Sequence, residues 1–467
     1  MARRRPIFDA LASALIGLAI FAFFGRTFLN YDTFYALLWG GDLAHGRMPD
    51  YKVPFAPTPH PLAVLAGIPA SLFADTGEGI LLAIVIAALG ALVVGIFRLG
   101  EEVAGRWVGL LAALIVATRV PFLNYGIRGY VDLVEIALIV WAAVLEMRRP
   151  RRGVAVLVLL GLAGLLRPEA WLYAGAYWLW LFPASDWPRR ARLALLVIAP
   201  PLIWGLTDLE ISGDFLWSLH GTHELASELG RRTGLFNAIE TGPRRLGEIL
   251  RLPELIAAVA GFALGLIWMR RRTALPAALV VLNGLAFAVL ALAGLSLLGR
   301  YLFLAGAVLA VFAALGCLGW TELPPGHPAR RGWQAFGVIA LAAIAVFFGL
   351  QQVDRLDSLR TDIRARASVQ ADLHALPLAG CTRVYVPNHR LVPLLAYWHD
   401  IRPRDIKAST PVTGRGQSVL PANAEVQRLS ILDPHEPRVL DLRPPPGLRP
   451  IASNRSWRLY AALRCGF

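Results

Sequence analysis

Long runs of apolar residues, broken by short polar stretches, occupy the first 350 residues of the chain. Such runs predict helices that cross a bilayer, because a crossing needs about 20 predominantly apolar residues. We predict eleven crossings, at residues 7–28, 79–97, 107–123, 130–147, 153–166, 170–183, 193–206, 254–269, 273–298, 301–320 and 333–350. The apolar segment 62–73 is too short to cross, so we predict a helix that lies in the membrane interface.

Clusters of arginine predict the side of the membrane on which each of these spans begins and ends. They lie between the apolar runs, at Arg3–Arg5, Arg148–Arg152, Arg189–Arg192, Arg270–Arg272 and Arg330–Arg331. Cytoplasmic loops are enriched in Arg and Lys, so we place these clusters inside the cell. The N-terminus is then cytoplasmic, and the residues after 350 lie outside. The first run has no small-residue cleavage site before Asn30, which predicts a retained span.

The composition agrees with a membrane protein. Apolar residues make up 56% of the chain, charged residues 17%, and the mean hydropathy is +0.55. The net charge of +14 is carried by clusters between apolar runs, so it does not indicate nucleic-acid binding. Lys52 and Lys407 are the only lysines, and Ala, Gly, Leu and Arg are abundant. This usage is typical of a GC-rich bacterial genome and predicts a multi-pass protein of the bacterial inner (plasma) membrane.

The segment 351–467 differs in character from the predicted transmembrane domain, residues 1–350. Asp, Arg, Pro and His occur throughout, and apolar runs have strand length, as in 383–387. We predict a small α/β extracytoplasmic domain with a loop at Pro444–Pro446. Cys381 and Cys465 are its only cysteines. We predict a disulfide between them worth about 4 kcal/mol, the alternative being two unpaired buried thiols.

Polar residues gather at the predicted outer face, directly after the first span. They form the stretches Asn30–Thr33, Trp39–Gly46, Tyr51 and Pro57–Leu62. Ionisable groups close to a bilayer are costly to place, so their presence here indicates a functional site.

This arrangement resembles the GT-C superfamily of integral membrane glycosyltransferases, such as protein mannosyltransferases and aminoarabinose transferases, which take a sugar from a polyprenyl phosphate. In that superfamily an acidic residue just past the first span, juxtamembrane helices and a Pro-rich stretch similar to "HPPL" shape the active site. The resemblance implies an all-α polytopic membrane fold with interfacial helices in its outer loops. It implies that Asp32 is the catalytic acidic residue and that His60 belongs to the substrate-binding site.

The role implied for Asp32 is chemically sound. An acceptor hydroxyl needs a base to take its proton as it attacks the anomeric carbon, and a carboxylate at the membrane boundary can do so. The alternative is that Asp32 only caps a helix that starts at Thr33.

Two predicted hairpin tips also resemble the superfamily. Arg167 and Glu169 resemble its "R-x-E/D" turn, and Arg300 with Tyr301 resembles an Arg–Tyr pair that faces the lipid phosphate in related enzymes. A guanidinium at the interface would stabilise the negative charge that grows on a phosphate leaving group. The alternative for both arginines is snorkelling to lipid headgroups.

Three further features complete the candidate site. Arg128 and Asp132 lie on the same outer side, where Asp132 either orients Arg128 or forms a structural salt bridge. His220 and His223 have helical spacing but no third metal ligand, and the first outer loop lacks an Asp-x-Asp pair. We therefore predict no metal and no other cofactor. The segment 207–253 is predicted to form interfacial helices, with Trp217 as an aromatic anchor.

The function predicted from these features is transfer of a hexosyl or pentosyl group. The donor would be a polyprenyl-phosphate sugar, with a mannose or pentose of cell-wall biosynthesis implied by the resemblance. The acceptor would be an extracytoplasmic glycan, lipid or protein, and the transfer would be metal-independent and inverting. A membrane transporter or lipid flippase is the alternative, although the predicted spans lack the mid-bilayer ionisable residues common in transporters. A scaffold protein is a third possibility, against which the polar first loop argues.

Overall fold

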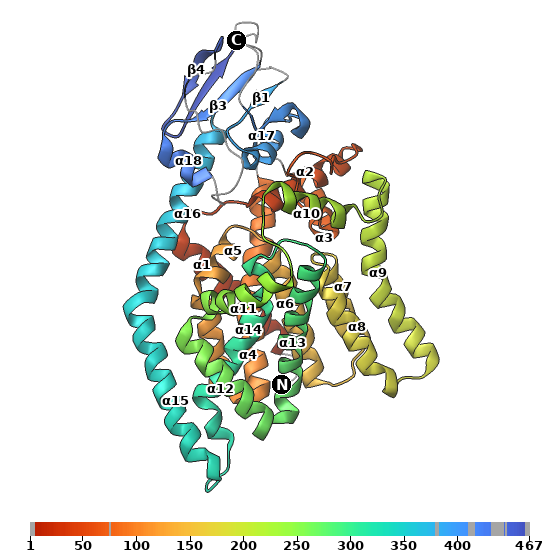
Figure 1. Ribbon diagram of the computed structural model, residues 1–467, viewed down its shortest axis with the longest axis vertical. Coiled ribbons are helices and arrows are strands. Elements are labelled where there is room, and N and C mark those ends of the chain that lie inside the picture. The colour runs from red at the N-terminus through yellow and green to blue at the C-terminus, as the bar shows by residue number, and fades with distance from the viewer. Residues whose placement is uncertain are drawn as a thin grey trace.

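The computed structural model describes residues 5–73, 76–378, 383–409, 416–430, 443 and 446–462. Helices fill most of the molecule, and a small sheet lies at one end (Figure 1). The first helices are α1 (Arg5–Phe24), α2 (Tyr31–Ala44), α3 (Pro61–Ser71), α4 (Gly77–Thr118), α5 (Val120–Ile127), α6 (Asp132–Arg148), α7 (Val154–Gly164), α8 (Glu169–Leu181) and α9 (Trp187–Ser212). They are followed by α10 (Trp217–Glu228), α11 (Leu235–Leu250), α12 (Leu252–Trp268), α13 (Arg270–Leu292), α14 (Phe303–Leu318), α15 (Pro328–Phe347) and α16 (Val353–His374).

Helices occupy every segment for which the sequence predicts a span. The span 79–97 and residues 107–118 of the span 107–123 are the two arms of α4, which turns back at Ala104 and Gly105, where the glycine has φ of +80°. Residues 120–123 of the second span belong to α5. Among the described residues, six helices are long and apolar enough to cross a membrane, or seven if the bent pair α11 and α12 counts as one span. The chain is therefore an integral membrane protein. The number of eleven crossings remains a prediction, because α6, α7, α8 and α12 have 17 residues or fewer.

Helix α14 forms the centre of the membrane part. Each residue from Phe303 to Cys317 is buried, and α14 packs against α4, α12, α13 and α15. Close approach to α12 depends on glycine: a Cβ built at Gly261 would lie 1.9 Å from the backbone oxygen of Phe312. Small residues allow membrane helices to pack backbone to backbone, so Gly261 lets α12 lie directly against α14.

Helices α2 and α3 form a layer beneath the C-terminal domain. They touch at Gly40, where an added Cβ would lie 2.4 Å from the backbone of Gly67. Their N-terminal residues, Asp32 and His60, reach the same cavity. The contact of the two glycines thus sets the spacing of two predicted site residues.

The C-terminal segment begins as a helix. The predicted domain boundary at residue 350 falls inside continuous helix, because a π-helical turn, Phe348–Gln352, joins α15 to α16. A five-stranded mixed sheet of order β2-β1-β3-β5-β4 follows. Its strands are β1 (Val384–Tyr385), β2 (Ile406–Lys407), β3 (Gln417–Pro421), β4 (Arg449–Ser453) and β5 (Trp457–Ala461), with the helices α17 (Val392–Trp398) and α18 (Ala424–Ser430).

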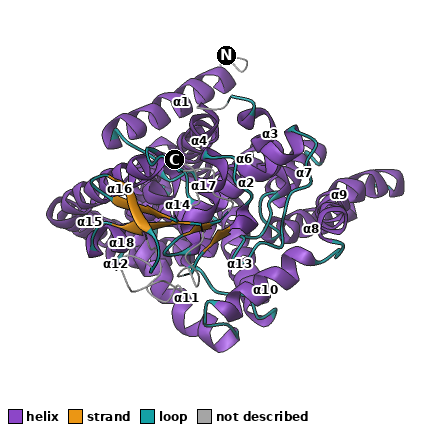
Figure 2. Ribbon diagram, turned by 90° about the horizontal axis from the view of Figure 1, so that it is seen from above, coloured by secondary structure: helices purple, strands orange, loops and turns teal. Residues whose placement is uncertain are grey.

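Aromatic contacts join this domain to the membrane part. The Phe34 ring of α2 meets the rings of Tyr397 and Trp398 edge to face, at centroid distances of 6.3 and 5.7 Å. Figure 1 shows α17 directly beside α2, and Figure 2 shows the sheet above the helices. The predicted Cys381–Cys465 disulfide and most of the Pro444–Pro446 loop lie outside the described residues.

Candidate active site

A cavity of about 310 Å³ lies where α2, three hairpin tips and the C-terminal domain meet. The structure brings the eight predicted catalytic and substrate-binding residues together in this cavity and a space next to it. Six of them line the cavity: Asp32, His60, Arg128, Arg167, Arg300 and Tyr301. The other two, Asp132 and Glu169, line a smaller adjoining space together with Arg167, Arg300 and Tyr301.

The start of α2 decides between the two interpretations of Asp32. Asn30 is the N-cap, since its side-chain oxygen accepts hydrogen bonds from the backbone N–H groups of Asp32 and Thr33. The capping alternative for Asp32 is therefore wrong. Its carboxylate instead accepts a hydrogen bond from Arg300, with Oδ2 3.0 Å from Nη1, and both side chains stay at least 14% exposed. The pair is thus open to a ligand in the cavity.

A second ion pair lies directly behind the first. Arg167 donates a hydrogen bond to Oδ1 of Asp132, and Arg300 Nε lies 3.8 Å from the same oxygen. The prediction that Asp132 orients Arg128 is wrong, because Arg128 donates to the Tyr130 hydroxyl at 3.2 Å. Proximity in sequence favours a pair between Arg128 and Asp132, but the turn between α7 and α8 brings Arg167 within hydrogen-bonding distance of Asp132.

The three arginines keep unused hydrogen-bonding capacity. The Nε atoms of Arg128, Arg167 and Arg300 are buried and have no hydrogen-bond partner within the described residues. Arg167 is 7% exposed and is tied to Asp132, so it does not snorkel to the membrane surface, and Arg300 is held inside by Asp32. A guanidinium with free N–H groups is suited to bind phosphate oxygens in a bidentate manner.

The charged side chains around the cavity shift the pKa values of Asp32 and His60. Burial raises the pKa of Asp32, but the attraction and hydrogen bond of Arg300, aided by Arg167, outweigh it and hold the pKa below its ordinary value. Burial and then the Arg167 charge lower the pKa of His60 to about 3. Near neutral pH, Asp32 is an anion and His60 is a neutral imidazole, with a buried Nδ1 that has no described partner.

We expect the buried His60 to make the protein less stable in mild acid. The unfolded chain protonates a histidine near pH 6.5, whereas the folded protein does so near 3, so stability is lost as the pH falls through this window. Thermal unfolding in detergent at pH 7.5 and 5.0 should show a smaller acid-induced drop in Tm for His60→Gln than for the unchanged protein.

The control for this prediction is His220→Gln, at an exposed histidine next to Asp214. It should leave the acid-induced drop as it is. An unchanged drop in His60→Gln would contradict the lowered pKa of His60 in the folded protein.

The structure adds residues that the sequence did not reveal. His389, Arg390, Tyr31, Tyr125, Tyr130 and Arg231 also line the cavity. The His389 ring stacks on Phe55 at a centroid distance of 4.8 Å and meets the Tyr31 ring edge to face at 5.3 Å. The C-terminal domain therefore forms part of the wall. The sequence feature that could have indicated His389 and Arg390 is the polar run after the predicted strand 383–387, since functional residues often lie in loops that follow strands.

The segment 207–253 contains α10 and α11, as the sequence predicts. His220 Nδ1 lies 2.7 Å from Asp214 Oδ2. In the described part of the chain, no three His, Cys, Asp or Glu side chains cluster as they would around a metal ion. The predicted histidine pair thus has no third partner there.

Comparison with known proteins gives similarity in structure only. No family model matches the sequence, and no curated protein matches it. ArnT from Cupriavidus metallidurans bound to undecaprenyl phosphate aligns with a TM-score of 0.56 and 11% identity over 98% of both chains. The Archaeoglobus fulgidus oligosaccharyltransferase in complex with Zn and sulfate aligns with a TM-score of 0.49 and 13% identity, over 86% of this chain and 62% of that chain. Along nearly its whole length, the chain therefore has the same fold as ArnT.

Proposed function

We propose that the chain is a membrane glycosyltransferase that moves a sugar from a polyprenyl-phosphate donor to an acceptor hydroxyl on a glycan, lipid or protein. The observation that carries this proposal is the Asp32–Arg300 ion pair in a cavity whose arginines have unused donors. The fold supports it, because the ArnT structure of the same fold holds undecaprenyl phosphate.

The arginines would bind the leaving group. As the bond between the anomeric carbon and the phosphate oxygen breaks, its electron pair stays on that oxygen and the negative charge of the polyprenyl phosphate grows. Arg300 and Arg167 line the cavity and can meet this charge with their guanidinium groups, which would lower the barrier more than it strengthens ground-state binding. Asp132 would position Arg167 for this task.

Asp32 would act as the base. Its carboxylate takes the proton of the acceptor hydroxyl while the hydroxyl oxygen forms a bond to the anomeric carbon, on the face opposite the departing phosphate. This displacement inverts the anomeric configuration and needs neither a metal ion nor another cofactor. The lowered pKa keeps Asp32 ionised at neutral pH.

An assay with purified protein tests the function. A radiolabelled polyprenyl-phospho-mannose or polyprenyl-phospho-pentose should be consumed, with label appearing on an added acceptor extract and polyprenyl phosphate released. A flippase would instead move the labelled lipid across vesicles without consuming it. Movement without consumption would therefore contradict the proposal.

We place the chain in a bacterial inner membrane, with the N-terminus in the cytoplasm and the cavity and C-terminal domain outside. The arginine clusters support this orientation. The shared cavity puts the residues of the first loop next to His389 of the C-terminal domain. Both segments must therefore lie on one side of the membrane.

Cysteine labelling tests this topology. In a chain with Cys317, Cys381 and Cys465 changed to Ser, a single cysteine at Ser453 should react with an impermeant maleimide in intact spheroplasts. One at Thr321 should react only after the membrane is opened. Both positions are exposed, Ser453 on β4 and Thr321 before α15. The reverse pattern at either position would invert the proposed orientation.

A further inference from the structure

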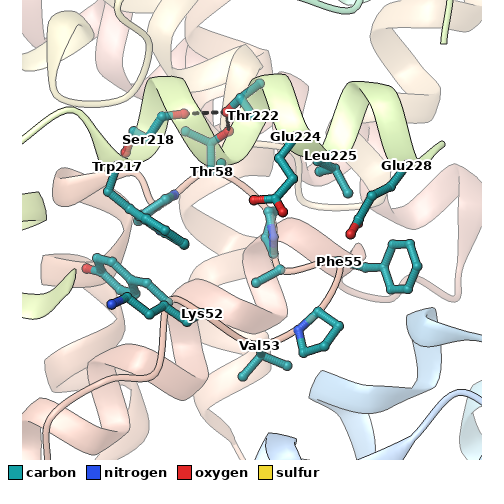
Figure 3. Close-up of a pocket in the computed structure, with 16 residues that line it drawn as sticks. Lys52, Val53, Phe55, Thr58, Trp217, Ser218, Thr222, Glu224, Leu225 and Glu228 are labelled. Atoms are coloured by element: carbon teal, nitrogen blue, oxygen red, sulfur yellow. Dashed lines mark hydrogen bonds between the residues drawn. The ribbon is translucent and has the colours of Figure 1, made fainter. Parts of the chain in front are cut away.

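A second cavity, of about 200 Å³, opens beside the proposed active site; we call it the vestibule. Its walls are the loop from Tyr51 to Pro59 and the inner face of α10 (Figure 3). Five residues line both cavities: Phe55, Pro57, Thr58, Thr222 and Leu225. A molecule held in the vestibule would thus reach directly toward Asp32.

Two hydroxyl groups mark the boundary between the cavities. The Thr58 and Thr222 oxygens lie 2.5 Å apart, and the Thr222 hydroxyl donates to the backbone oxygen of Ser218. Thr58 must therefore donate to Thr222, which leaves the Thr58 oxygen able to accept from a ligand.

Two carboxylates enter the vestibule from α10. Figure 3 shows Glu224 and Glu228 on the side of the helix that faces the loop. Neither forms a salt bridge with another described residue. Both side chains are exposed, so a ligand in the vestibule can reach them. Unpaired carboxylates are strong acceptors for hydroxyl groups.

An aromatic ring lies at the other end of the vestibule. Trp217 is half-buried, and the ammonium group of Lys52 lies 5.6 Å from the centre of its ring. The face of an indole is electron-rich and attracts the weakly positive C–H groups of a sugar ring. Lys52 is exposed and has a flexible stem, so it can make room for a ligand.

The two cavities differ in charge. Arginines dominate the active-site cavity, while two glutamates face a single lysine in the vestibule. An anionic ligand would be repelled from the vestibule, whereas a neutral polyol would find acceptors and an aromatic face. The phosphate of the donor therefore fits the first cavity, and an uncharged sugar fits the second.

We propose that the vestibule binds a neutral sugar ring of the acceptor, with Trp217 against its face and Glu224 and Glu228 accepting hydrogen bonds from its hydroxyls. The acceptor role rests on the glycosyltransferase function proposed above. A sugar bound there would present its next hydroxyl past Thr58 toward Asp32. The acceptor class is then a hydroxyl-rich glycan or glycolipid, and not an unmodified peptide.

Saturation-transfer NMR on the full chain in lipid nanodiscs tests this binding. The probes are the methyl glycosides of glucose, galactose, mannose and arabinose, with methyl glucuronide as the anionic comparison. We expect at least one neutral glycoside to bind, and Trp217→Ala to weaken it about tenfold, since the stacking face is lost. Trp187→Ala, at a tryptophan that is 72% exposed at the start of α9, should leave it unchanged.

The double variant Glu224→Gln with Glu228→Gln is a second test that keeps side-chain size. It should weaken neutral glycosides and let methyl glucuronide bind better than it does to the unchanged protein. The inference is overturned if no glycoside binds, or if binding is the same in both vestibule variants. Consumption of the labelled donor, measured on the same samples, distinguishes failure of the vestibule proposal from failure of the proposed glycosyltransferase function. Glycoside binding by protein that never consumes a donor would remove the acceptor role, whereas donor consumption without binding would remove the vestibule alone.

Discussion

Replacing Asp32 by Asn is expected to lower the rate of sugar transfer by a factor of about 100 or more. The amide matches the carboxylate in shape and can still accept a hydrogen bond from Arg300, but it cannot take the proton of the acceptor. Because Asn30 caps α2, the helix should form as before. The loss should appear in kcat, measured by transfer of radiolabelled sugar, in protein that still folds and inserts.

Asp42→Asn is the matched control, at a carboxylate near the other end of α2. Asp42 pairs with Arg47, at 3.0 Å, and lines neither cavity. Its substitution should leave transfer within about twofold, as for most surface sites. Full activity in well-folded Asp32→Asn would mean that another group is the base, and the proposed mechanism would then be wrong.

Arg300→Lys is expected to weaken the apparent affinity for the donor about tenfold and to lower kcat as well. Lysine keeps the positive charge but loses the planar fork that can hold two phosphate oxygens, and charge-assisted hydrogen bonds of this kind are worth about 1.5–3 kcal/mol. Initial rates at varied donor concentration separate KM from kcat.

Arg244→Lys provides the comparison, since Arg244 is 78% exposed on α11 and pairs with Glu248. Both constants should stay the same in this variant. If Arg300→Lys lowered kcat alone, Arg300 would serve to hold Asp32 and would not bind the donor phosphate. The two active-site substitutions should therefore differ, with Asp32→Asn acting on turnover and Arg300→Lys partly on donor affinity.

The helices and the grouping of site residues could be predicted from local sequence. Apolar runs predict helices wherever the solvent is lipid, and the hairpin tips with Arg167 and Arg300 follow from the alternation of these runs. Polar residues at tips on one side of a membrane are forced into one layer. Because that layer is thin, residues far apart in sequence, such as Asp32 and Arg300, are confined to a small volume and are expected to lie close together.

The partners within the layer could not be predicted. Asp132 is four positions from Arg128, yet it pairs with Arg167, because pairing depends on how each tip is rotated about its helices. His389 could not be assigned either, since nothing local says that the C-terminal domain rests on the first loop. Whether Asn30 or Asp32 caps α2 also depends on a difference of two residues in where the helix begins, Tyr31 or Thr33, and helix ends are the least certain part of a sequence-based prediction.

The ion pair at the centre of the site imposes an order on how the protein is made. Asp132 and Arg167 are 35 residues apart, whereas Asp32 and Arg300 are separated by 268. At about 5–20 residues per second, synthesis of that interval takes on the order of tens of seconds. During this time the nascent chain holds Asp32 at the membrane boundary without its counter-ion. A ribosome stalled before residue 300 would therefore leave an inserted chain in which Asp32 lacks Arg300.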